Sequence, residues 1–228
     1  MFSLIVGGAA SGKSAFAEQL VLARAGRRTY IATMEPYDEE CVARIAKHRA
    51  RRADYGFATL ECPRNLGQAP VDKSANILLD CVGNLVANEL YTAPEEGGPA
   101  SDATTQVTAT SIGPASDAPF PDAPPRATTS PGKPIACPHS LYEARWPHVA
   151  RRIAADVLRL RDACANLTVV TNEVCLGGTE YEGDTIPYMR CLAFVNRLLA
   201  TEADLVCEIV AGMPNVLKGD LEGLYPCA

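Results

Sequence analysis

The sequence predicts an α/β domain in which helices cover both faces of a mostly parallel β-sheet. Short apolar runs bounded by turn residues alternate with longer segments in which apolar residues recur with the helical period. Parallel strands need a crossover segment between them, usually a helix, so this alternation is typical of a parallel sheet. A chain of 228 residues can also bury a full hydrophobic core. We therefore expect one domain over residues 1–228, with a single insert inside it.

Five strands and five helices make up this alternation. The apolar runs predict strands at residues 2–6, 28–34, 76–81, 167–173 and 203–211, where Val, Ile, Leu and Thr gather. The helical period predicts helices at roughly 13–25, 38–51, 83–91, 141–164 and 185–200. The second of these helices has acids in its first turn and bases in its last, an arrangement that the helix dipole favours.

The segment 92–140 breaks the alternation. It holds ten of the seventeen prolines in the chain and almost no large apolar side chains. Such a segment cannot bury enough surface to offset the entropy that ordering removes. The hexapeptide GPASDA also occurs twice within it, at 98–103 and 113–118, which suggests a small duplication in a low-complexity segment. We expect a disordered insert within the domain.

Composition excludes several classes of protein. The net charge of −6 argues against general nucleic-acid binding. The nine cysteines are odd in number and scattered, without a C-x-x-C pair, which favours reduced thiols over a disulfide framework. No apolar run approaches the roughly 18 residues of a membrane span. We expect a cytoplasmic protein that binds no nucleic acid and does not span a membrane.

The octapeptide GGAASGKS at residues 7–14 matches the phosphate-binding loop G-x-x-x-x-G-K-[ST]. An expected strand precedes it and an expected helix follows it, which is the context that the motif requires. Loop N–H groups and a helix N-terminus attract phosphate oxygens, while Lys13 reaches the β- and γ-phosphates and Ser14 holds Mg²⁺. The fold class is therefore that of a P-loop NTPase, RecA-like. The expected nucleotide contacts are Gly7, Gly8, Ala9, Ala10, Ser11, Gly12, Lys13 and Ser14.

Acidic residues end two of the expected strands. Asp80 follows a buried run at the carboxyl end of its strand, where P-loop proteins keep an acid facing Mg²⁺. An Asp in this place can also be an ordinary turn residue. Glu173 ends the strand at 167–173 and is a further candidate contact. These signals indicate a nucleoside triphosphate as ligand, but kinase, hydrolase and switch all remain open.

The basic stretch RIAKHRARR, residues 44–52, surrounds His48 with cations. On a helix, Arg44 and His48 lie one turn apart, as do Lys47 and Arg51, so the bases form neighbouring ridges. Nearby cations disfavour protonation of His48, which would keep its imidazole neutral and nucleophilic near neutral pH. The same charges also fit an ordinary surface helix, so the residues alone leave both interpretations open.

Several motifs in order resemble one family. They are GGAASGKS, YIAT at 30–33, DEECVARIAKHR at 38–49, an acid at Glu61, ILLD at 77–80 and VTNEV at 170–174. Together they resemble the bifunctional adenosylcobinamide kinase/adenosylcobinamide-phosphate guanylyltransferase family of cobalamin biosynthesis. The resemblance implies that ATP or GTP phosphorylates adenosylcobinamide. It further implies that GTP then gives GMP, through a GMP–histidine intermediate, to adenosylcobinamide phosphate, which yields adenosylcobinamide-GDP.

The same resemblance assigns roles to residues. It implies that His48 is the residue that accepts GMP, that Mg²⁺ assists, and that the protein is a homo-oligomer, possibly a trimer. Beyond the phosphate loop, it implies nucleotide contacts at Ile31, Ala32, Thr33, Arg49, Ala50, Arg51, Arg52, Glu61 and Asp80. Two alternatives remain open: a chain that retains only one of the two activities, and a nucleotide-dependent regulatory or binding module without guanylyl transfer.

Overall fold

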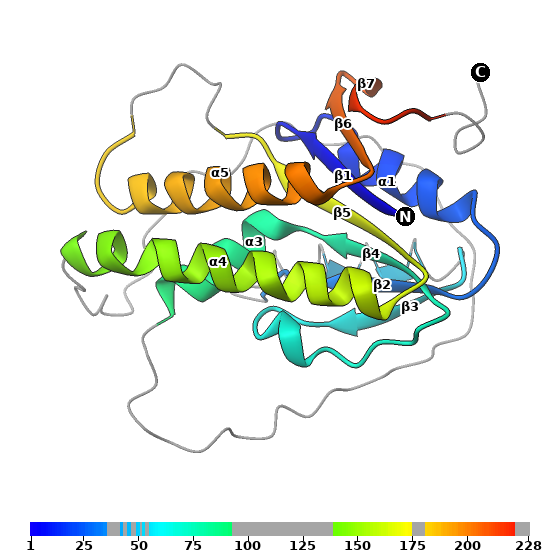
Figure 1. The fold of residues 1–228 in the computed structure, drawn as a ribbon, viewed down its shortest axis with the longest axis horizontal. Coiled ribbons are helices and arrows are strands. Elements are labelled where there is room, and N and C mark those ends of the chain that lie inside the picture. Colours follow the sequence, from blue (N-terminus) through cyan, green and yellow to red (C-terminus); the bar gives the residue numbers. More distant parts are fainter. Residues whose placement is uncertain are drawn as a thin grey trace.

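The computed structural model describes residues 1–35, 55–92, 139–174 and 181–221, together with residues 42, 45, 46, 49, 50 and 52. One sheet of seven strands forms its centre (Figure 1). The strands are β1 (Phe2–Gly7), β2 (Arg28–Ala32), β3 (Phe57–Glu61), β4 (Asn76–Asp80), β5 (Asn166–Asn172), β6 (Leu205–Val210) and β7 (Met213–Lys218). The helices are α1 (Lys13–Leu22), the short 3₁₀ helix η1 (Leu66–Gln68), α3 (Val82–Tyr91), α4 (His139–Ala163) and α5 (Thr185–Glu202).

The sheet has the strand order β3-β2-β4-β5-β1-β6-β7. Strands β1 to β6 pair in parallel, and only β7 runs antiparallel, against β6. This confirms the predicted mostly parallel α/β class. The order places β5 between β1, which precedes the phosphate loop, and β4, which ends at Asp80. The carboxyl ends of these three strands therefore meet at one edge of the sheet.

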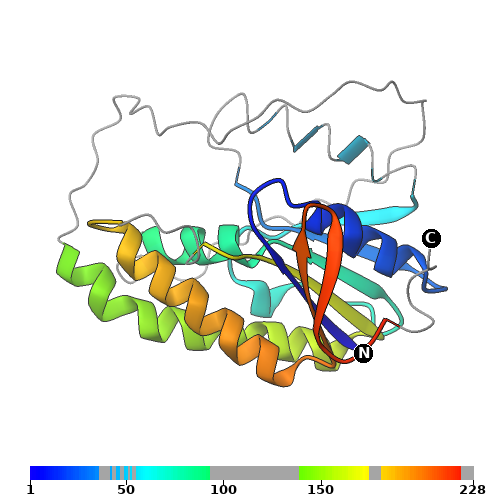
Figure 2. The same cartoon turned by 90° about the horizontal axis from the view of Figure 1, so that it is seen from above.

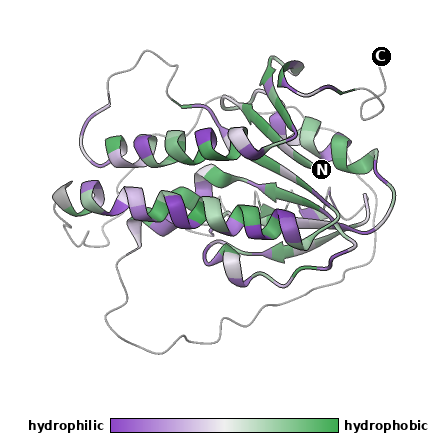
Figure 3. Ribbon diagram, in the orientation of Figure 1, coloured by the Kyte–Doolittle hydropathy of each residue, from purple (hydrophilic) through white to green (hydrophobic). Residues whose placement is uncertain are grey.

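Helices lie on both faces of the sheet, as Figure 2 shows from above. Helix α1 packs on one face, while α3, α4 and α5 pack together on the other. Side chains alternate between the faces of a strand, so Leu4 of β1 joins the core under α3, α4 and α5, whereas Ile5 joins the core under α1. Both faces are buried, which explains the nearly continuous apolar strands, visible as the hydrophobic colour along the sheet in Figure 3.

All five predicted strands are present, and two further strands were not predicted. Strand β3 is a five-residue edge strand in which only Phe57 and Leu60 are buried, so it lacks a long apolar run. Strand β7 is exposed along its whole length and contains Pro214. It forms because the tight turn at Ala211 and Gly212, both with positive φ, folds the chain back on β6.

The helix boundaries differ slightly from those predicted. Helix α1 ends at Leu22, three residues early, and α4 begins at His139, two residues early. Of the helix predicted at 38–51, the described residues 42, 45, 46, 49 and 50 are helical, and so is residue 52. The insert predicted at 92–140 lies outside the described residues except for its ends. In the described part of the chain, no helix is both long and apolar enough to cross a membrane.

Candidate functional site

The phosphate loop connects the end of β1 to the start of α1. Its backbone turns through positive φ angles at Ala10 (54°) and at Gly12 (89°), and Gly12 is the N-cap of α1. Glycine adopts this conformation without strain, which explains the motif's second glycine. A Cβ on Gly7 would lie 2.5 Å from the Ser11 Oγ and 2.9 Å from the Ile209 carbonyl oxygen. The first glycine is therefore required by close packing of the loop against β6.

Neighbouring strands hold the loop from both sides. The Glu173 N–H, just beyond β5, donates to the Gly7 carbonyl oxygen at 3.1 Å, and the Gly212 N–H donates to the Ser11 carbonyl oxygen at 2.9 Å. The Lys13 Nζ donates to the Gly8 carbonyl oxygen at 2.9 Å, so its ammonium group lies over the loop. The loop is thus shaped before any ligand arrives, with a helix N-terminus and a cation directed at an anion site.

Ser11 places a buried hydroxyl oxygen within the phosphate loop. Its Oγ is buried and, among the described residues, has no hydrogen-bond partner. Buried hydroxyls in folded proteins are normally paired, so such an atom within a phosphate loop fits a ligand oxygen or a water molecule.

Asp80 lies at the end of β4 with one oxygen already bound. The Tyr30 hydroxyl donates to the Asp80 Oδ2 at 2.7 Å, whereas no described residue donates to Oδ1. Both Asp80 and Lys13 act electrostatically on the buried Cys81 thiol, whose pKa is raised to about 12, chiefly by burial. The strand-end acid and the loop lysine therefore lie within electrostatic range of the same thiol. The carboxylate oxygen Oδ1 of Asp80 is a ligand of the kind that Mg²⁺ takes when it also binds nucleotide oxygens.

Tyr30 connects Asp80 to the basic stretch. Its side chain is only 5% exposed, and the Arg52 guanidinium carbon lies 3.4 Å from the centre of its ring. Arg52 is itself 3% exposed, so this is a desolvated cation–π contact. Burial and the nearby Asp80 charge raise the pKa of Tyr30 well above its usual range, so its hydroxyl remains a donor at neutral pH.

The ends of β2 and β4 are clamped together beside this site. The Thr33 Oγ1 donates to the Cys81 carbonyl oxygen and accepts from the Cys81 N–H, both at 2.8 Å. The Thr33 N–H also donates to the Asp80 carbonyl oxygen at 3.2 Å. The side chains of Ile31 and Thr33 are completely buried and that of Ala32 nearly so. These three predicted nucleotide contacts are thus buried beside Asp80.

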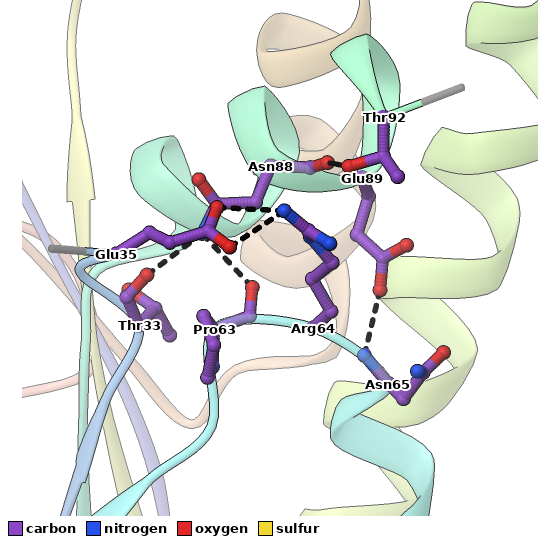
Figure 4. Close-up of polar contacts among 8 residues, drawn as sticks. All are labelled: Thr33, Glu35, Pro63, Arg64, Asn65, Asn88, Glu89 and Thr92. Atoms are coloured by element: carbon purple, nitrogen blue, oxygen red, sulfur yellow. Dashed lines mark hydrogen bonds and ion pairs between the residues drawn. The ribbon is translucent and has the colours of Figure 1, made fainter. Parts of the chain in front are cut away.

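Asn88 of α3 extends the clamp to the end of β3 (Figure 4). Its Nδ2 donates to the Thr33 carbonyl oxygen at 2.8 Å and to the Pro63 carbonyl oxygen at 2.9 Å. Nearby, the Arg64 Nη2 donates to both carboxylate oxygens of Glu35, at 2.6 and 2.8 Å. These bonds fix the chain on both sides of the segment that carries His48.

Glu89, one residue further along α3, joins two more elements to the same cluster. The Asn65 N–H donates to the Glu89 Oε1 at 2.8 Å (Figure 4), and Arg152 of α4 forms an ion pair with the Glu89 Oε2. The buried carboxylate thus ties the segment after β3 to α3 and α4.

Two predicted nucleotide contacts meet each other. The Arg49 Nε and Nη2 donate to the Glu61 Oε1 at 3.0 and 2.7 Å, and both side chains are partly exposed. Glu61, at the end of β3, therefore binds the basic stretch directly. Ala50 is exposed, and Arg52 is buried against Tyr30. His48 and Arg51 lie outside the described residues.

Sequence reasoning missed Tyr30, Asn88 and Arg64. An aromatic residue in a buried strand normally belongs to the core, so Tyr30 was included in the YIAT motif but was not predicted as a site residue. Asn88 carried a usable signal, because an asparagine amid the apolar residues of α3 is a poor helix former that needs a buried partner.

A pocket of about 370 Å³ opens beside the phosphate loop, between α5 and the strands β1, β6 and β7. Its polar lining residues are Asn172, Glu173, Asn196 and Arg197. The Thr171 Oγ1 donates to the Asn196 Oδ1 at 2.6 Å, and the Asn196 Nδ2 donates to the Asn172 carbonyl oxygen at 3.1 Å. The polar end of the pocket is therefore fixed next to Gly7.

A protein-family model and several known proteins are similar to this chain. The family model of cobinamide kinase / cobinamide phosphate guanyltransferase matches residues 3–217. The bifunctional adenosylcobalamin biosynthesis protein CobU of Salmonella typhimurium is 38% identical, over 96% of this chain and all of that protein. The protein of the same name from Escherichia coli is 37% identical, and CobP of Pseudomonas aeruginosa is 40% identical. Each of these two matches covers 40% of this chain, with 51% and 53% of the respective relative.

Proposed function

The chain belongs to the cobinamide kinase / cobinamide phosphate guanyltransferase family, and we propose that both reactions of this family use the sheet edge where the phosphate loop and Asp80 meet the basic stretch. The protein is a bifunctional transferase of cobalamin biosynthesis. It phosphorylates adenosylcobinamide with a nucleoside triphosphate, and it transfers GMP from GTP to adenosylcobinamide phosphate to give adenosylcobinamide-GDP.

In the kinase step, the hydroxyl oxygen of the aminopropanol arm attacks the γ-phosphorus and the nucleoside diphosphate leaves. The loop N–H groups and Lys13 hold the β- and γ-phosphates in line for this attack and neutralise their charge. Ser14 and the Asp80 Oδ1, to which no described residue donates, are the groups that would hold Mg²⁺, which supplies further charge neutralisation when bound. Glu173, fixed beside Gly7, is a candidate contact for the acceptor.

In the guanylyl transfer step, a neutral nitrogen of His48 attacks the α-phosphorus of GTP and pyrophosphate leaves. A phosphate oxygen of adenosylcobinamide phosphate then attacks the phosphorus of the GMP–histidine intermediate and frees the histidine. The cations of the basic stretch favour this chemistry because they disfavour protonation of His48 and neutralise the phosphate under attack. Glu61 suits an exposed guanine edge, where its carboxylate accepts hydrogen bonds.

The observation that carries the proposal is the preformed phosphate loop at the carboxyl end of β1, with Lys13 over it. Product analysis with two variants tests it. Lys13→Ala is expected to abolish phosphorylation of adenosylcobinamide and the formation of adenosylcobinamide-GDP. His48→Ala is expected to keep the kinase reaction and to accumulate adenosylcobinamide phosphate. Normal guanylyl transfer by His48→Ala would contradict the assignment of His48, and a parent protein with neither activity would favour the regulatory module.

The proposal also includes the assembly and the cellular location of the protein. The family resemblance favours a homo-oligomer in the cytoplasm, with a trimer as the expected form. The fully exposed edge strand β7 is compatible with a subunit contact, because it presents Met213 at 69% and Leu217 at 60% exposure. Light scattering after size-exclusion chromatography measures the mass in solution, and a monomeric mass at micromolar concentration would contradict the oligomer.

A further inference from the structure

We propose that Tyr30 is a positioning residue that joins the two halves of the site, with its hydroxyl fixing Asp80 and its ring fixing Arg52. The inference rests on the proposed role of Asp80 at the Mg²⁺ side of the nucleotide. It assigns a function to a side chain that is only 5% exposed. Tyr30 acts through its two neighbours.

The hydroxyl of Tyr30 decides how the Asp80 carboxylate is presented. The bond to Oδ2 is 2.7 Å long and joins a neutral donor to a charged acceptor, which is the stronger class of hydrogen bond. It prevents rotation of the carboxylate and leaves Oδ1 facing away from the phenol. Loss of the hydroxyl would leave Oδ2 without its donor and allow the group to turn.

The ring of Tyr30 decides where Arg52 lies. The guanidinium carbon is 3.4 Å from the ring centre, and the ring edge meets Phe57 at a centroid distance of 6.3 Å and an angle of 90°. Phe57 begins β3 and is buried, so the ring is held from the side as well. Arg52 comes four residues after His48 in the sequence, so its anchorage restrains the end of the basic stretch.

A purely structural tyrosine would not need these particular neighbours. The ring packs in the core under α1, a place that phenylalanine fills equally well. The hydroxyl, by contrast, donates to Asp80 at the end of β4, and one face of the buried ring contacts the Arg52 cation of the basic stretch. Substitution can therefore separate the hydroxyl from the ring.

Tyr30→Phe removes the hydroxyl and keeps the ring. In calorimetric titration, Mg²⁺ is expected to bind the GTP complex about tenfold more weakly, a shift of the size that one charge-assisted hydrogen bond produces. The Mg²⁺ concentration for half-maximal kinase rate is expected to rise by the same factor. The rate at saturating Mg²⁺ is expected to stay near that of the parent. Tyr91→Phe is the matched control, because the Tyr91 hydroxyl also makes a 2.7 Å bond, to the Asp184 carbonyl oxygen, outside the site.

Tyr30→Leu also removes the ring. At saturating Mg²⁺ it is expected to guanylylate His48 about tenfold more slowly than Tyr30→Phe, since a desolvated cation–π contact is lost. Arg52→Lys, which keeps the charge but not the planar stacking, tests the same contact if Tyr30→Leu does not fold. Equal guanylylation rates in Tyr30→Phe and in the variant that lacks the contact would overturn the role of the ring.

Asp80→Asn separates failure of this inference from failure of the proposed site. If Asp80→Asn raises the Mg²⁺ requirement and Tyr30→Phe does not, the role of the Tyr30 hydroxyl is overturned and the proposed function stands. If Asp80→Asn leaves the requirement unchanged, the role of Asp80 is overturned, and with it the basis of the inference. A uniform loss of activity at every Mg²⁺ concentration in Tyr30→Phe would indicate a structural role alone and would also overturn the proposal.

Discussion

Asn88→Ala is expected to lower the free energy of unfolding by about 3 kcal/mol, because the Thr33 and Pro63 carbonyl groups each lose a donor, at about 1–3 kcal/mol per group. Asn88 is 3% exposed and bonds the Thr33 and Pro63 carbonyl oxygens at 2.8 and 2.9 Å. The Pro63 carbonyl is only partly buried, so water can replace that bond in part. The expected total therefore lies in the lower half of the roughly 2–6 kcal/mol that two such losses span.

Urea unfolding followed by circular dichroism measures this loss. If the slope of the unfolding free energy against urea concentration is the same in variant and parent, the change is one of stability. Asn84→Ala is the matched control, since Asn84 lies on the same helix in a half-buried place. It is expected to lose less than about 1 kcal/mol. A loss in Asn88→Ala no larger than in Asn84→Ala would refute the argument that Asn88 joins β2, β3 and α3.

Further outcomes follow from the loop, the Arg49–Glu61 pair and the thiols. Gly7→Ala is expected to cost about 1–3 kcal/mol of stability and to weaken GTP binding in calorimetry, whereas Gly8→Ala, with open space around it, should cost less stability. Glu61→Gln is expected to weaken GTP binding but to change the unfolding free energy by less than about 1 kcal/mol, because the ion pair is exposed; a larger loss would contradict this. Burial raises the pKa of the Cys191 thiol from 9.0 to about 12. As the pH rises, the thiol therefore ionises first in the unfolded chain, so the free energy of unfolding should stay constant to about pH 8 and decrease above pH 9. Cys191→Ala should reduce that loss in urea titrations from pH 7 to pH 11, and an identical pH profile would contradict the shift.

The central strands of the sheet could be predicted from the sequence because strands buried on both faces are continuous apolar runs. Residues such as Leu78 and Leu79 face opposite cores, so β4 appears as an unbroken apolar run. The edge strands β3 and β7 have no such pattern, since one is half-buried and the other fully exposed. Their positions depend on pairing with β2 and β6, which no local rule supplies.

The candidate site likewise has one part that the sequence predicted and one part that it did not. The phosphate loop was predictable because its glycines and lysine act within eight consecutive residues. The bond from Tyr30 to Asp80 joins residues fifty positions apart. It depends on the register that places Tyr30 opposite Leu78 in the parallel pair of β2 and β4. Such a contact between a core tyrosine and a strand-end acid becomes visible only when the sheet is assembled.

The GMP–histidine intermediate gives the most direct test of the central claim, that this site transfers GMP through His48. The protein is incubated with Mg²⁺ and GTP labelled at the α-phosphate, and the labelled peptide is identified by mass spectrometry. The account predicts one acid-labile, base-stable GMP adduct on His48, absent from His48→Ala. No adduct in the parent protein under conditions in which GTP binds, or an adduct on another residue, would contradict it.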